Sequence, residues 1–362
     1  MGILCPGRCV VIAEAGVNHN GSQDMALKLV DAAAAAGADA VKFQTFKADS
    51  LVSRRAPKAA YQRITTDPDE SQWAMIQRLE LDVAAHRRLQ AHCQAAGIAF
   101  LSSPFDLESL NFLLHDLHLG VIKIPSGELT NGPLLLAAGR SGQEIILSTG
   151  MATLAEIETA LGVLAFGLLG VTGPPGRVAF QNAFVSPAGG RILREQARLL
   201  HCTTEYPAPF AEVNLRGMEV LREAFGLPTG YSDHTEGVAV AIAAVARGAV
   251  VVEKHFTLDR DLPGPDHRAS LEPEQLAVMI RGIREVEAAM GDGRKVPTPA
   301  ELKNRDVARK SLVALQDIPA GTLFSEENLG ARRPGGGLSP MEWWSLLGRP
   351  AARDYARDQE IV

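Results

Sequence analysis

Two lysines lie inside apolar runs of the sequence and are followed by side chains that donate hydrogen bonds. Lys42 lies in the run Val41-Lys-Phe-Gln-Thr45, and Lys123 lies in Val121-Ile-Lys-Ile124, shortly before Ser126. A lone lysine after a strand is usually a surface residue whose ammonium group reaches solvent. Two lysines near several hydroxyl groups instead match the donors that bind a phosphate. We therefore predict an anion site around Lys123 and Ser126, with Lys42 nearby.

Two histidines, His234 and His255, follow two consecutive apolar runs, Thr229–Tyr231 and Ala249–Lys254. If these runs are neighbouring strands, they lie about 4.8 Å apart and both imidazoles can reach one ion. A histidine pair is a weak metal signal by itself, because water and substrate oxygens would have to complete the coordination. The pair predicts a divalent metal site with open positions, and a purely structural pair is the alternative.

Short apolar runs that could position these residues alternate with longer amphipathic stretches along the first 290 residues. Eight βα units over about 250 residues predict a TIM (β/α)8 barrel, of class α/β. An open doubly wound sheet is the alternative, but Ala13–Gly21, after the first run, holds no Gly-rich dinucleotide fingerprint. The expected strands are Val10–Ala13, Ala40–Phe43, Ile98–Leu101, Val121–Ile124, Glu144–Leu147, Arg198–Cys202, Thr229–Tyr231 and Ala249–Lys254.

Almost every expected strand ends in polar or ionisable residues. In a TIM barrel the active site forms where the strands end and the βα loops begin. Polar groups are costly to bury without partners, so their convergence at these ends indicates a binding site. The strand-end residues are Glu14, Lys42, Gln44, Ser102, Ser103, Lys123, Ser126, Glu128, Ser148, Thr149, Thr203, Thr204, Tyr206, Ser232, Asp233, His234, Glu253 and His255.

Amphipathic stretches between the runs predict the covering helices. One of them begins with Thr153-Leu-Ala-Glu156, a capping box in which each side chain satisfies a backbone N–H. The Gly- and Pro-containing segment Gly170–Gly190 predicts an irregular, enlarged surface excursion. The expected helices are Asp24–Ala36, Val83–Ala96, Leu107–Leu117, Thr153–Ala165 and Val213–Phe225.

The pattern changes after Met290, where a Gly- and Pro-rich stretch begins. Such a composition is typical of a domain boundary. We therefore divide the chain into a barrel domain (1–290), a linker (291–308) and a small module of turns (309–362). Within the module, Ser311–Ala314 and Ala352–Asp354 are the expected strand-like pieces.

The composition excludes several classes of function. The net charge of −6 argues against a nucleic-acid partner, although a small anionic substrate needs only a few local cations. No segment approaches the roughly 20 apolar residues of a membrane span, and no signal-peptide pattern opens the sequence. The four cysteines, Cys5 and Cys9 among them, have no metal-site spacing. Reduced thiols suit a cytoplasmic protein.

Read in order, the strand ends resemble those of the sialic-acid synthase family, the synthases of N-acetylneuraminate, legionaminate and pseudaminate. The small module, with Arg333-Pro-Gly-Gly-Gly337, resembles the antifreeze-like SAF (β-clip) domain appended to these enzymes. Ala56–Gln62 and Glu70–Gln72 resemble the neuraminate and legionaminate branches. The matching stretches are Ile12–Gly21, Val41–Thr45, Ser103–Phe105, Lys123–Glu128, Leu147–Met151, His201–Pro207, Ser232–Thr235, Glu253–Thr257 and Pro263–Asp266.

The resemblance implies a reaction and a set of roles. The family condenses phosphoenolpyruvate with an N-acetylmannosamine-type sugar, releases phosphate and forms a nine-carbon 2-keto sugar acid. His234 and His255 would hold a divalent cation, Mn²⁺ or Mg²⁺, and Glu128 would be the acid/base residue. Arg333 would reach into the barrel of a partner subunit, which implies a domain-swapped homodimer. Phe43 stands where some relatives carry a polar residue, so it would alter contacts with the sugar.

Substrate contacts follow from the same resemblance. The phosphate of phosphoenolpyruvate would meet a lysine and several hydroxyls, and Lys42 would meet its carboxylate. Thr204 would be a further contact to phosphoenolpyruvate. The phosphate ligands would be Ser103, Lys123, Ser126, Ser148 and Ser232, and Glu14, Gln44, Tyr206 and Asp266 would meet the sugar or a water at the metal.

Two other functions compete with this interpretation. Another barrel aldolase would form a Schiff base through Lys42, Lys123 or Lys254 and act on a sugar aldehyde. A non-enzymatic carbohydrate-binding or ice-binding protein is suggested by the small module alone. Within the synthase interpretation, the acceptor stays open between N-acetylmannosamine and 2,4-diacetamido-2,4,6-trideoxymannose.

Overall fold

The computed structural model describes residues 7–67 and 69–362, so Cys5 lies outside the described residues. It divides into two compact units, Met1–Gly291 and Asp292–Val362, which are considered one at a time. In the described part of the chain, no helix has the length and apolar character needed to cross a membrane.

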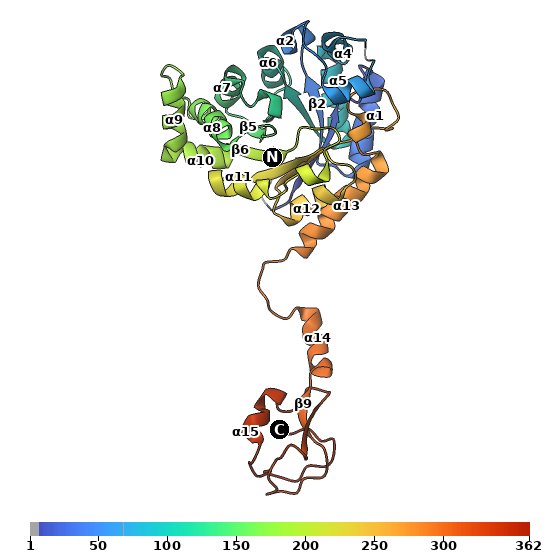
Figure 1. The fold of residues 1–362 in the computed structure, drawn as a ribbon, viewed down its shortest axis with the longest axis vertical. Helices are drawn as coiled ribbons and strands as arrows, with labels where there is room; N and C mark the ends of the chain where they lie inside the picture. Colours follow the sequence, from blue (N-terminus) through green and yellow to red (C-terminus); the bar gives the residue numbers. More distant parts are fainter. Residues whose placement is uncertain (1–6, 68) are drawn as a thin grey trace. The chain divides into compact units, whose positions relative to one another are not determined.

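The first unit is a barrel of parallel strands surrounded by helices (Figure 1), as the sequence predicts. The strand order is β3-β2-β1-β8-β7-β6-β5-β4, and β3 and β4, the two ends of this order, lie next to each other. All eight predicted strands are confirmed, and most run on by one to three residues. Their bounds are β1 (Val10–Gly16), β2 (Ala40–Thr45), β3 (Ala99–Pro104), β4 (Val121–Ile124), β5 (Glu144–Ser148), β6 (Ala197–Cys202), β7 (Thr229–Asp233) and β8 (Val251–His255).

The barrel interior is layered because alternate residues of each strand point inward. On β1, the apolar Val10 and Ile12 face inward and are followed on the same face by Glu14. The lower layers therefore form a dry core, and the charged residues lie above it at the carboxyl ends of the strands. The inner apolar cluster consists of Val10, Ile12, Ala40, Leu101, Val121, Ile146, Leu200 and Val251.

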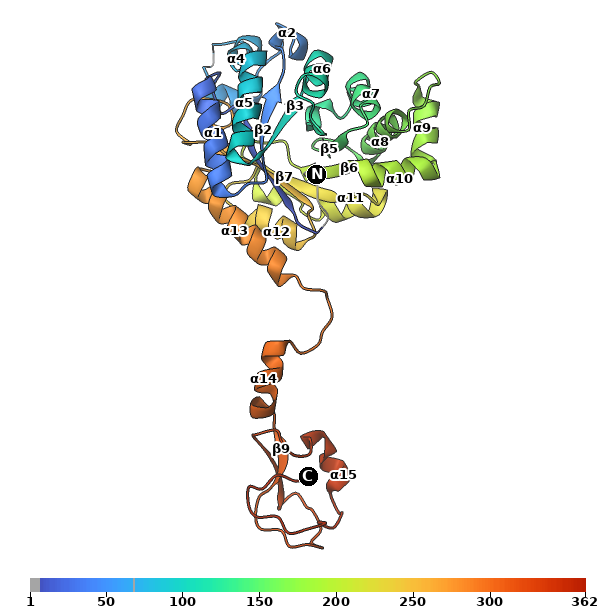
Figure 2. The ribbon, with the colours of Figure 1, turned by 180° about the vertical axis from the view of Figure 1, so that it is seen from behind.

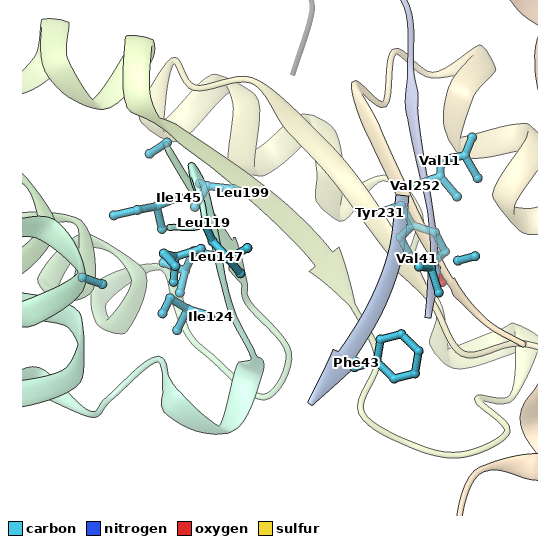
Figure 3. Close-up of a cluster of buried hydrophobic side chains, with 14 of the residues drawn as sticks. Val11, Val41, Phe43, Leu119, Ile124, Ile145, Leu147, Leu199, Tyr231 and Val252 are labelled. Carbon is cyan, nitrogen blue, oxygen red and sulfur yellow. The ribbon is translucent and has the colours of Figure 1, made fainter. Parts of the chain in front are cut away.

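The outward-facing residues of the strands form the larger core, against the helices. Figure 3 labels Val41 and Phe43 of β2, Tyr231 of β7 and Val252 of β8 among the buried side chains of this core. Phe43 is fully buried and stacks on Phe100 with ring centroids 6.0 Å apart. Because Phe43 points away from the barrel interior, the expectation that it alters sugar contacts is wrong.

Side chains of N-cap residues mark where most barrel helices begin. Ser22, Asp82 and Thr153 each accept a hydrogen bond from a backbone N–H of the first turn, and Glu156 completes the predicted capping box. The bounds are α1 (Gln23–Ala36), α2 (Ala48–Leu51), α3 (Ala60–Thr65), α4 (Gln72–Arg78), α5 (Val83–Ala96), α6 (Leu107–His115), α7 (Gly132–Arg140), α8 (Leu154–Leu168), α9 (Arg177–Val185), α10 (Pro187–Gln196), α11 (Gly217–Phe225), α12 (Ala239–Ala246) and α13 (Pro273–Ala289), with 3₁₀ turns η1 (Ser126–Glu128), η2 (Phe210–Glu212) and η3 (His267–Ala269).

Two helical expectations need correction. The segment Gly170–Gly190 is largely helical, because Ser186 caps α10 and the ring of Phe180 on α9 packs edge-on against Phe166 of α8, 5.3 Å between centroids. Figure 2 shows α8, α9 and α10 side by side. The helix expected from Val213 begins only at Gly217, because Asn214 adopts a positive φ of 44° that interrupts it.

The second unit begins with helix α14 (Pro299–Ala308), which occupies part of the stretch expected to be a linker. Its sheet pairs β9 (Ser311–Ala314), as predicted, with β10 (Leu329–Arg332). Ala352–Asp354 is not a strand; neighbouring residues make only single bridges, such as Ile318 to Tyr355. A short 3₁₀ turn, η4 (Pro340–Glu342), leads into α15 (Trp343–Leu346). Around the sheet lies a small core containing Leu312, Ile318, Phe324, Leu329, Ala351, Tyr355 and Ile361.

Candidate active site at the carboxyl ends of the strands

A cavity of about 250 Å³ opens at the carboxyl ends of the strands. The structure brings into it every residue to which the resemblance gave a role except Glu128 and Arg333, whereas the strand-end residues Ser102, Thr149, Thr203 and Asp233 do not line it. The residues brought together come from all eight strand ends or the loops that follow them, so the parallel barrel is what collects them. They are Glu14, Lys42, Gln44, Ser103, Lys123, Ser126, Ser148, Thr204, Tyr206, Ser232, His234, His255 and Asp266.

An ion network forms the floor of the cavity. Lys42 Nζ lies 2.7 Å from Glu14 Oε2 and 3.5 Å from Glu253 Oε2, and Lys123 Nζ lies 3.0 Å from Glu253 Oε1. All four side chains are nearly inaccessible to solvent. Burial alone would raise the pKa of Glu253, but the two lysines outweigh it and lower that pKa. Burial does raise the pKa of Glu14, with Lys42 opposing and Glu253 adding to the rise.

The pKa of Lys42 is raised, because the attraction of Glu14 and Glu253 outweighs the lowering effect of burial. A Schiff-base lysine needs a lowered pKa to act as a nucleophile at neutral pH. Lys42 therefore stays charged, so it can bind an anion but is a poor nucleophile for attack on a carbonyl. It also donates to Ser103 Oγ at 3.1 Å, which orients that hydroxyl toward the cavity floor.

Hydroxyl groups beside the lysines include some without a hydrogen-bond partner. Ser148 Oγ and Thr204 Oγ1 are buried and unpaired among the described residues. Ser126 Oγ accepts from the backbone N–H of Gly150 at 3.0 Å and lies 3.1 Å from Cys202 Sγ. Because buried polar atoms are rarely left unpaired, these hydroxyls point to a ligand with several acceptor oxygens.

His234 and His255 lie close together in the same cavity, with ring centroids 5.4 Å apart. Tyr206 packs against both rings, 4.3 and 5.5 Å from their centroids. His234 Nδ1 lies 2.6 Å from the carbonyl oxygen of Thr203. A carbonyl oxygen can only accept, so Nδ1 carries the proton and Nε2 keeps its lone pair.

Burial lowers the pKa of His234 to about 4 and that of His255 well below its usual value. Both rings are therefore neutral near pH 7, the form that binds metals. His255 Nδ1 has no hydrogen-bond partner in the part of the chain that the structure describes, and it lies 3.9 Å from Asp266 Oδ2. Burial, with repulsion from Glu14, raises the pKa of Asp266 to about 7.

These donors fit a divalent cation with an incomplete protein coordination. The two imidazoles supply neutral nitrogen donors, and the unpaired His255 nitrogen is an open donor position. No group of three or more His, Cys, Asp or Glu side chains able to hold an ion occurs within residues 7–67 and 69–362. Water or substrate oxygens would therefore complete such a site, as in catalytic metal centres.

Two proposed residues lie elsewhere. Glu128 belongs to the short turn η1, where its Oε2 accepts from Asn131 Nδ2 at 2.7 Å; its neighbour Gly127 lines the cavity, but Glu128 does not. Burial raises the pKa of Glu128. Arg333 belongs to the second unit, where its side chain is exposed.

Glu253 is the residue whose importance sequence reasoning missed. It was among the strand-end residues but received no role, although it lies two positions before His255 on the same face of β8. In the structure it binds both cavity lysines and accepts from Ser232 Oγ at 2.8 Å. Lys254 points the opposite way, into the outer layer, where it pairs with Asp233 at 2.8 Å. Lys254 is therefore excluded as a nucleophile in this cavity.

Comparisons with known proteins agree with the resemblance. The chain matches the NeuB family over residues 29–295 and the SAF domain over residues 309–361. It is 50% identical to the N,N'-diacetyllegionaminic acid synthase of Campylobacter jejuni, over 98% of this chain and 99% of that protein. It is 42% identical to the N,N'-diacetyllegionaminic acid synthase of Legionella pneumophila, over 94% of this chain and 89% of that protein.

A solved structure shares the architecture. The N-acetylneuraminic acid (sialic acid) synthetase of Leptospira borgpetersenii is 31% identical, with a TM-score of 0.65, and the match covers 82% of this chain and 90% of that one. Fold and cavity together define a barrel enzyme whose site lies at the strand ends. The chain belongs to the NeuB family and is an enzyme of the synthase type, with a C-terminal SAF domain.

Proposed function

We propose that this enzyme condenses phosphoenolpyruvate with the open-chain aldehyde of an N-acetylmannosamine-type sugar, with a divalent metal, Mn²⁺ or Mg²⁺, as cofactor. The products are phosphate and a nine-carbon 2-keto sugar acid. One observation carries the proposal: a single cavity joins a lysine-and-hydroxyl anion site to a pair of neutral histidines. Such a cavity can hold the two substrates side by side, and positioning alone supplies a large part of the rate gain in such reactions.

The chemistry follows from the substrates. C3 of phosphoenolpyruvate forms a bond to the aldehyde carbon, and the aldehyde oxygen takes up a proton to become a hydroxyl. Water adds to the electron-poor C2 and loses its proton. The C2 hydroxyl then gives up its remaining proton as the C2–O bond to phosphate breaks, phosphate leaves with the electron pair of that bond, and the 2-keto acid remains. A divalent cation held by His234 and His255 supplies Lewis-acid polarisation when it is bound.

The anion site is assigned to phosphoenolpyruvate. Lys123 would meet the phosphate, and Lys42 would meet the carboxylate. The unpaired hydroxyls of Ser148 and Thr204 support this placement, because a phosphate offers acceptor oxygens to several donors at once. The remaining contacts would come from Ser103, Ser126 and Ser232.

Glu14 is the carboxyl group that the geometry favours for proton transfer. It lines the cavity, its pKa is raised by burial, and it lies 3.3 Å from Gln44 Nε2, which holds it in place. A raised pKa allows a carboxyl group to give and take protons near neutral pH. Glu128, which the resemblance implies as the acid/base residue, would act only if η1 brings its side chain into the cavity.

Gln44, Tyr206 and Asp266 would contact the sugar. The relatives from Campylobacter jejuni and Legionella pneumophila are both named as N,N'-diacetyllegionaminic acid synthases, which supports the legionaminate branch. We also propose the division into a barrel domain (1–290), a linker (291–308) and a SAF domain (309–362). A cytoplasmic location is proposed with it, because Cys9, Cys93 and Cys202 are free, buried thiols.

The test is release of phosphate from phosphoenolpyruvate by the purified, metal-loaded protein with each sugar offered separately. Phosphate release matched one-to-one by a nine-carbon keto acid, and abolished by a chelator, supports the proposal. An adduct trapped by borohydride on Lys42 or Lys123 would instead indicate an aldolase. Sugar binding without metal, phosphoenolpyruvate or turnover would indicate a carbohydrate-binding protein.

The domain-swapped homodimer has its own test. Arg333 would complete the cavity of a partner subunit, so Arg333→Ala should reduce kcat/KM by about 10²-fold, the typical loss for one positioned contact to a reacting group. Mixing refolded Arg333→Ala and His234→Ala subunits should restore part of the activity, because one site of each heterodimer is intact. Full activity of Arg333→Ala alone would contradict the role in the partner subunit.

A further inference from the structure

A thiol lines the cavity beside the hydroxyls of the anion site, and the proposed reaction gives it no role. Cys202 ends β6, and its side chain is buried at the lining of the cavity. Among the described residues, Cys9 and Cys93 are also free, buried thiols, but neither lines this cavity. Cys202 is therefore the described thiol that lies within reach of the groups that would bind a ligand.

Cys202 belongs to a tight cluster over the backbone of Gly150, in the loop after β5. A Cβ atom at Gly150 would overlap the hydroxyl oxygen of Thr204 and would lie 2.8 Å from Ser126 Oγ. It would also lie 2.9 Å from Cys202 Sγ. Glycine, which has no Cβ atom, therefore allows two hydroxyls and one thiol to converge on the same stretch of backbone.

Within this cluster, Ser126 Oγ is contacted from two sides. The backbone N–H of Gly150 donates to it at 3.0 Å, and Cys202 Sγ lies 3.1 Å away. A serine hydroxyl has two lone pairs that accept and one proton that it can donate. When the thiol donates as well, both lone pairs are used. The proton of the Ser126 hydroxyl is then left for a third group.

The thiol of Cys202 can donate because it stays protonated. Burial raises the pKa of Cys202, although the hydrogen bond with Ser126 and the charge of Lys123 oppose the rise. A thiol sulfur is a weak acceptor, whereas an anionic oxygen is a strong one. Ser126 therefore gains more by donating to an anion than by donating to Cys202, and the thiol is left as the donor between the two.

An unpaired hydroxyl at the end of β5 points to a ligand at this place. Ser148 Oγ lines the same cavity, is buried and has no hydrogen-bond partner among the described residues. Ser148 lies two residues before Gly150, and Lys123 on the neighbouring strand β4 supplies a cation. A phosphate offers the acceptor oxygens and the negative charge that these donors lack.

We propose that Cys202 is a positioning residue, whose S–H donates to Ser126 Oγ and thereby directs the Ser126 hydroxyl toward a phosphate oxygen of the bound ligand. The inference rests on the proposed function, because it takes that ligand to be phosphoenolpyruvate. No bond forms or breaks at the sulfur. Because the contact contributes to binding before the chemical step, its loss should raise KM for phosphoenolpyruvate and leave kcat nearly unchanged.

The experiment measures the Kd of phosphoenolpyruvate by titration calorimetry of the purified, metal-loaded protein without sugar, so that binding is separated from turnover. Cys202→Val replaces the thiol with an apolar side chain of similar size. We expect its Kd to rise about fivefold, the effect of losing one neutral hydrogen bond. Cys202→Ser keeps a donor and should stay within about twofold of native. A packing role predicts the reverse order, with valine tolerated and serine penalised.

A double variant tests whether the effect passes through the serine. In a Ser126→Ala background, Cys202→Val should change Kd no further, because the hydroxyl that the thiol orients is absent. Cys93→Val, at a buried thiol of α5 outside the cavity, is the matched control and should leave Kd unchanged. If Cys202→Val does not fold, Cys202→Ala removes the same donor without added bulk and takes its place in both comparisons.

The outcomes separate the positioning role from the proposed function. A native Kd in the variant that lacks the donor, or an undiminished effect of that variant in the Ser126→Ala background, overturns the positioning role of Cys202. Native protein that does not bind phosphoenolpyruvate at all overturns the proposed function itself.

Discussion

Two groups of buried ions lie back to back on β7 and β8. The inner group faces the cavity, where Glu253 meets Lys42 and Lys123. The outer group is the pair Asp233 and Lys254, at opposed positions of the two strands and fully inaccessible to solvent. Strand alternation puts Glu253 and His255 on one face and Lys254 on the other, so neighbouring residues in the sequence serve different environments.

The two groups differ in how completely their hydrogen bonds are satisfied. Lys254 Nζ donates to Asp233 Oδ2 at 2.8 Å and to the carbonyl of Thr235, while Asp233 Oδ1 accepts from the N–H and hydroxyl of Thr235 at 2.9 and 2.8 Å. In the inner group, Glu14 Oε2 and Glu253 Oε2 have ion pairs but, within residues 7–67 and 69–362, no hydrogen-bond partner of good geometry. An ion pair whose hydrogen bonds are all satisfied stabilises the fold, whereas an ion pair with unsatisfied hydrogen-bonding atoms remains available to a ligand.

The largest expected effect is a loss of activity, and it tests whether the inner group serves catalysis more than it serves the stability of the fold. Lys123→Met should lower kcat/KM about 10³- to 10⁴-fold, or about 4–5.5 kcal/mol, because the phosphate loses its cation. The free energy of unfolding should change by less than about 2 kcal/mol, since Glu253 keeps Lys42 as a partner. Phosphate release and urea denaturation measure the two quantities.

Lys28→Met is the matched control for that experiment, because Lys28 is an exposed lysine on α1. It should leave both quantities near their native values. A Lys123→Met enzyme with near-native kcat/KM would show that the inner group is structural too, and the comparison would then fail.

The next largest effect concerns the outer group. Lys254→Met should lower the free energy of unfolding by about 3–5 kcal/mol, because Asp233 is left as an uncompensated buried charge. Asp233→Asn combined with Lys254→Met should recover most of that loss, since both charges are then absent. Urea denaturation with circular dichroism gives the values.

The activity of the folded fraction sharpens this test. Because Lys254 points away from the cavity, kcat/KM per folded Lys254→Met molecule should stay within about tenfold of native. A far larger loss, with stability restored in the double variant, would mean that the outer pair positions His234 and His255 and is not only structural.

The sequence predicted the barrel and most of the cavity because both follow from strand order and alternation. Lys42, Lys123, His234 and His255 are strand-end residues, and parallel strands bring their ends together whatever the loop geometry. The outer position of Lys254 follows from the same alternation, which excludes this lysine as a nucleophile in the cavity. Glu253 was overlooked because a carboxylate beside lysines carries no motif of its own.

Other features depend on packing that no local pattern contains. Much of Gly170–Gly190 folds into helices because Phe180 packs against Phe166 of α8. The backbone of Phe180 also approaches Gly162 so closely that only glycine fits at that position. An apolar cluster combines Val17 with Met75, far apart in the sequence, and only the fold brings both to the lining of the cavity. Glu128 stays outside the cavity in a 3₁₀ turn, where its backbone N–H donates to Pro125 and its side chain accepts from Asn131.

The buried side chain of His19, in the outer layer, is not fully hydrogen-bonded and predicts that the stability of the fold depends on pH. His19 is fully buried against Phe43, and its Nε2 has no partner among the described residues. Burial, with repulsion from His86 and His267, lowers the pKa of His19 to about 3. Below its ordinary value of about 6.5, the unfolded chain binds a proton there and the folded chain does not, so stability falls as the pH falls.

The expected size is about 2 kcal/mol between pH 7 and pH 5, because the slope rises to 1.36 kcal/mol per pH unit only as the unfolded histidine becomes fully protonated. His19→Gln removes this contribution, so the stability difference between the native and variant proteins should shrink by that amount over the same interval. Urea denaturation at pH 7, 6 and 5 measures it. Parallel pH curves for the two proteins would mean that His19 becomes protonated in the folded state.

The smallest expected effect concerns Glu128, which belongs to neither ion group. Glu128→Gln should lower kcat/KM less than about tenfold, because its side chain lies outside the cavity and Asn131 can still hydrogen-bond to the amide oxygen. Glu14→Gln, the matched change inside the cavity, should cost about 10²-fold or more, the scale of a lost acid/base group. A reversed order, measured by phosphate release, would mean that η1 moves when substrate binds. Glu128 would then join the inner group as its acid/base residue, and the satisfied bond to Asn131 would be the contact released in that movement.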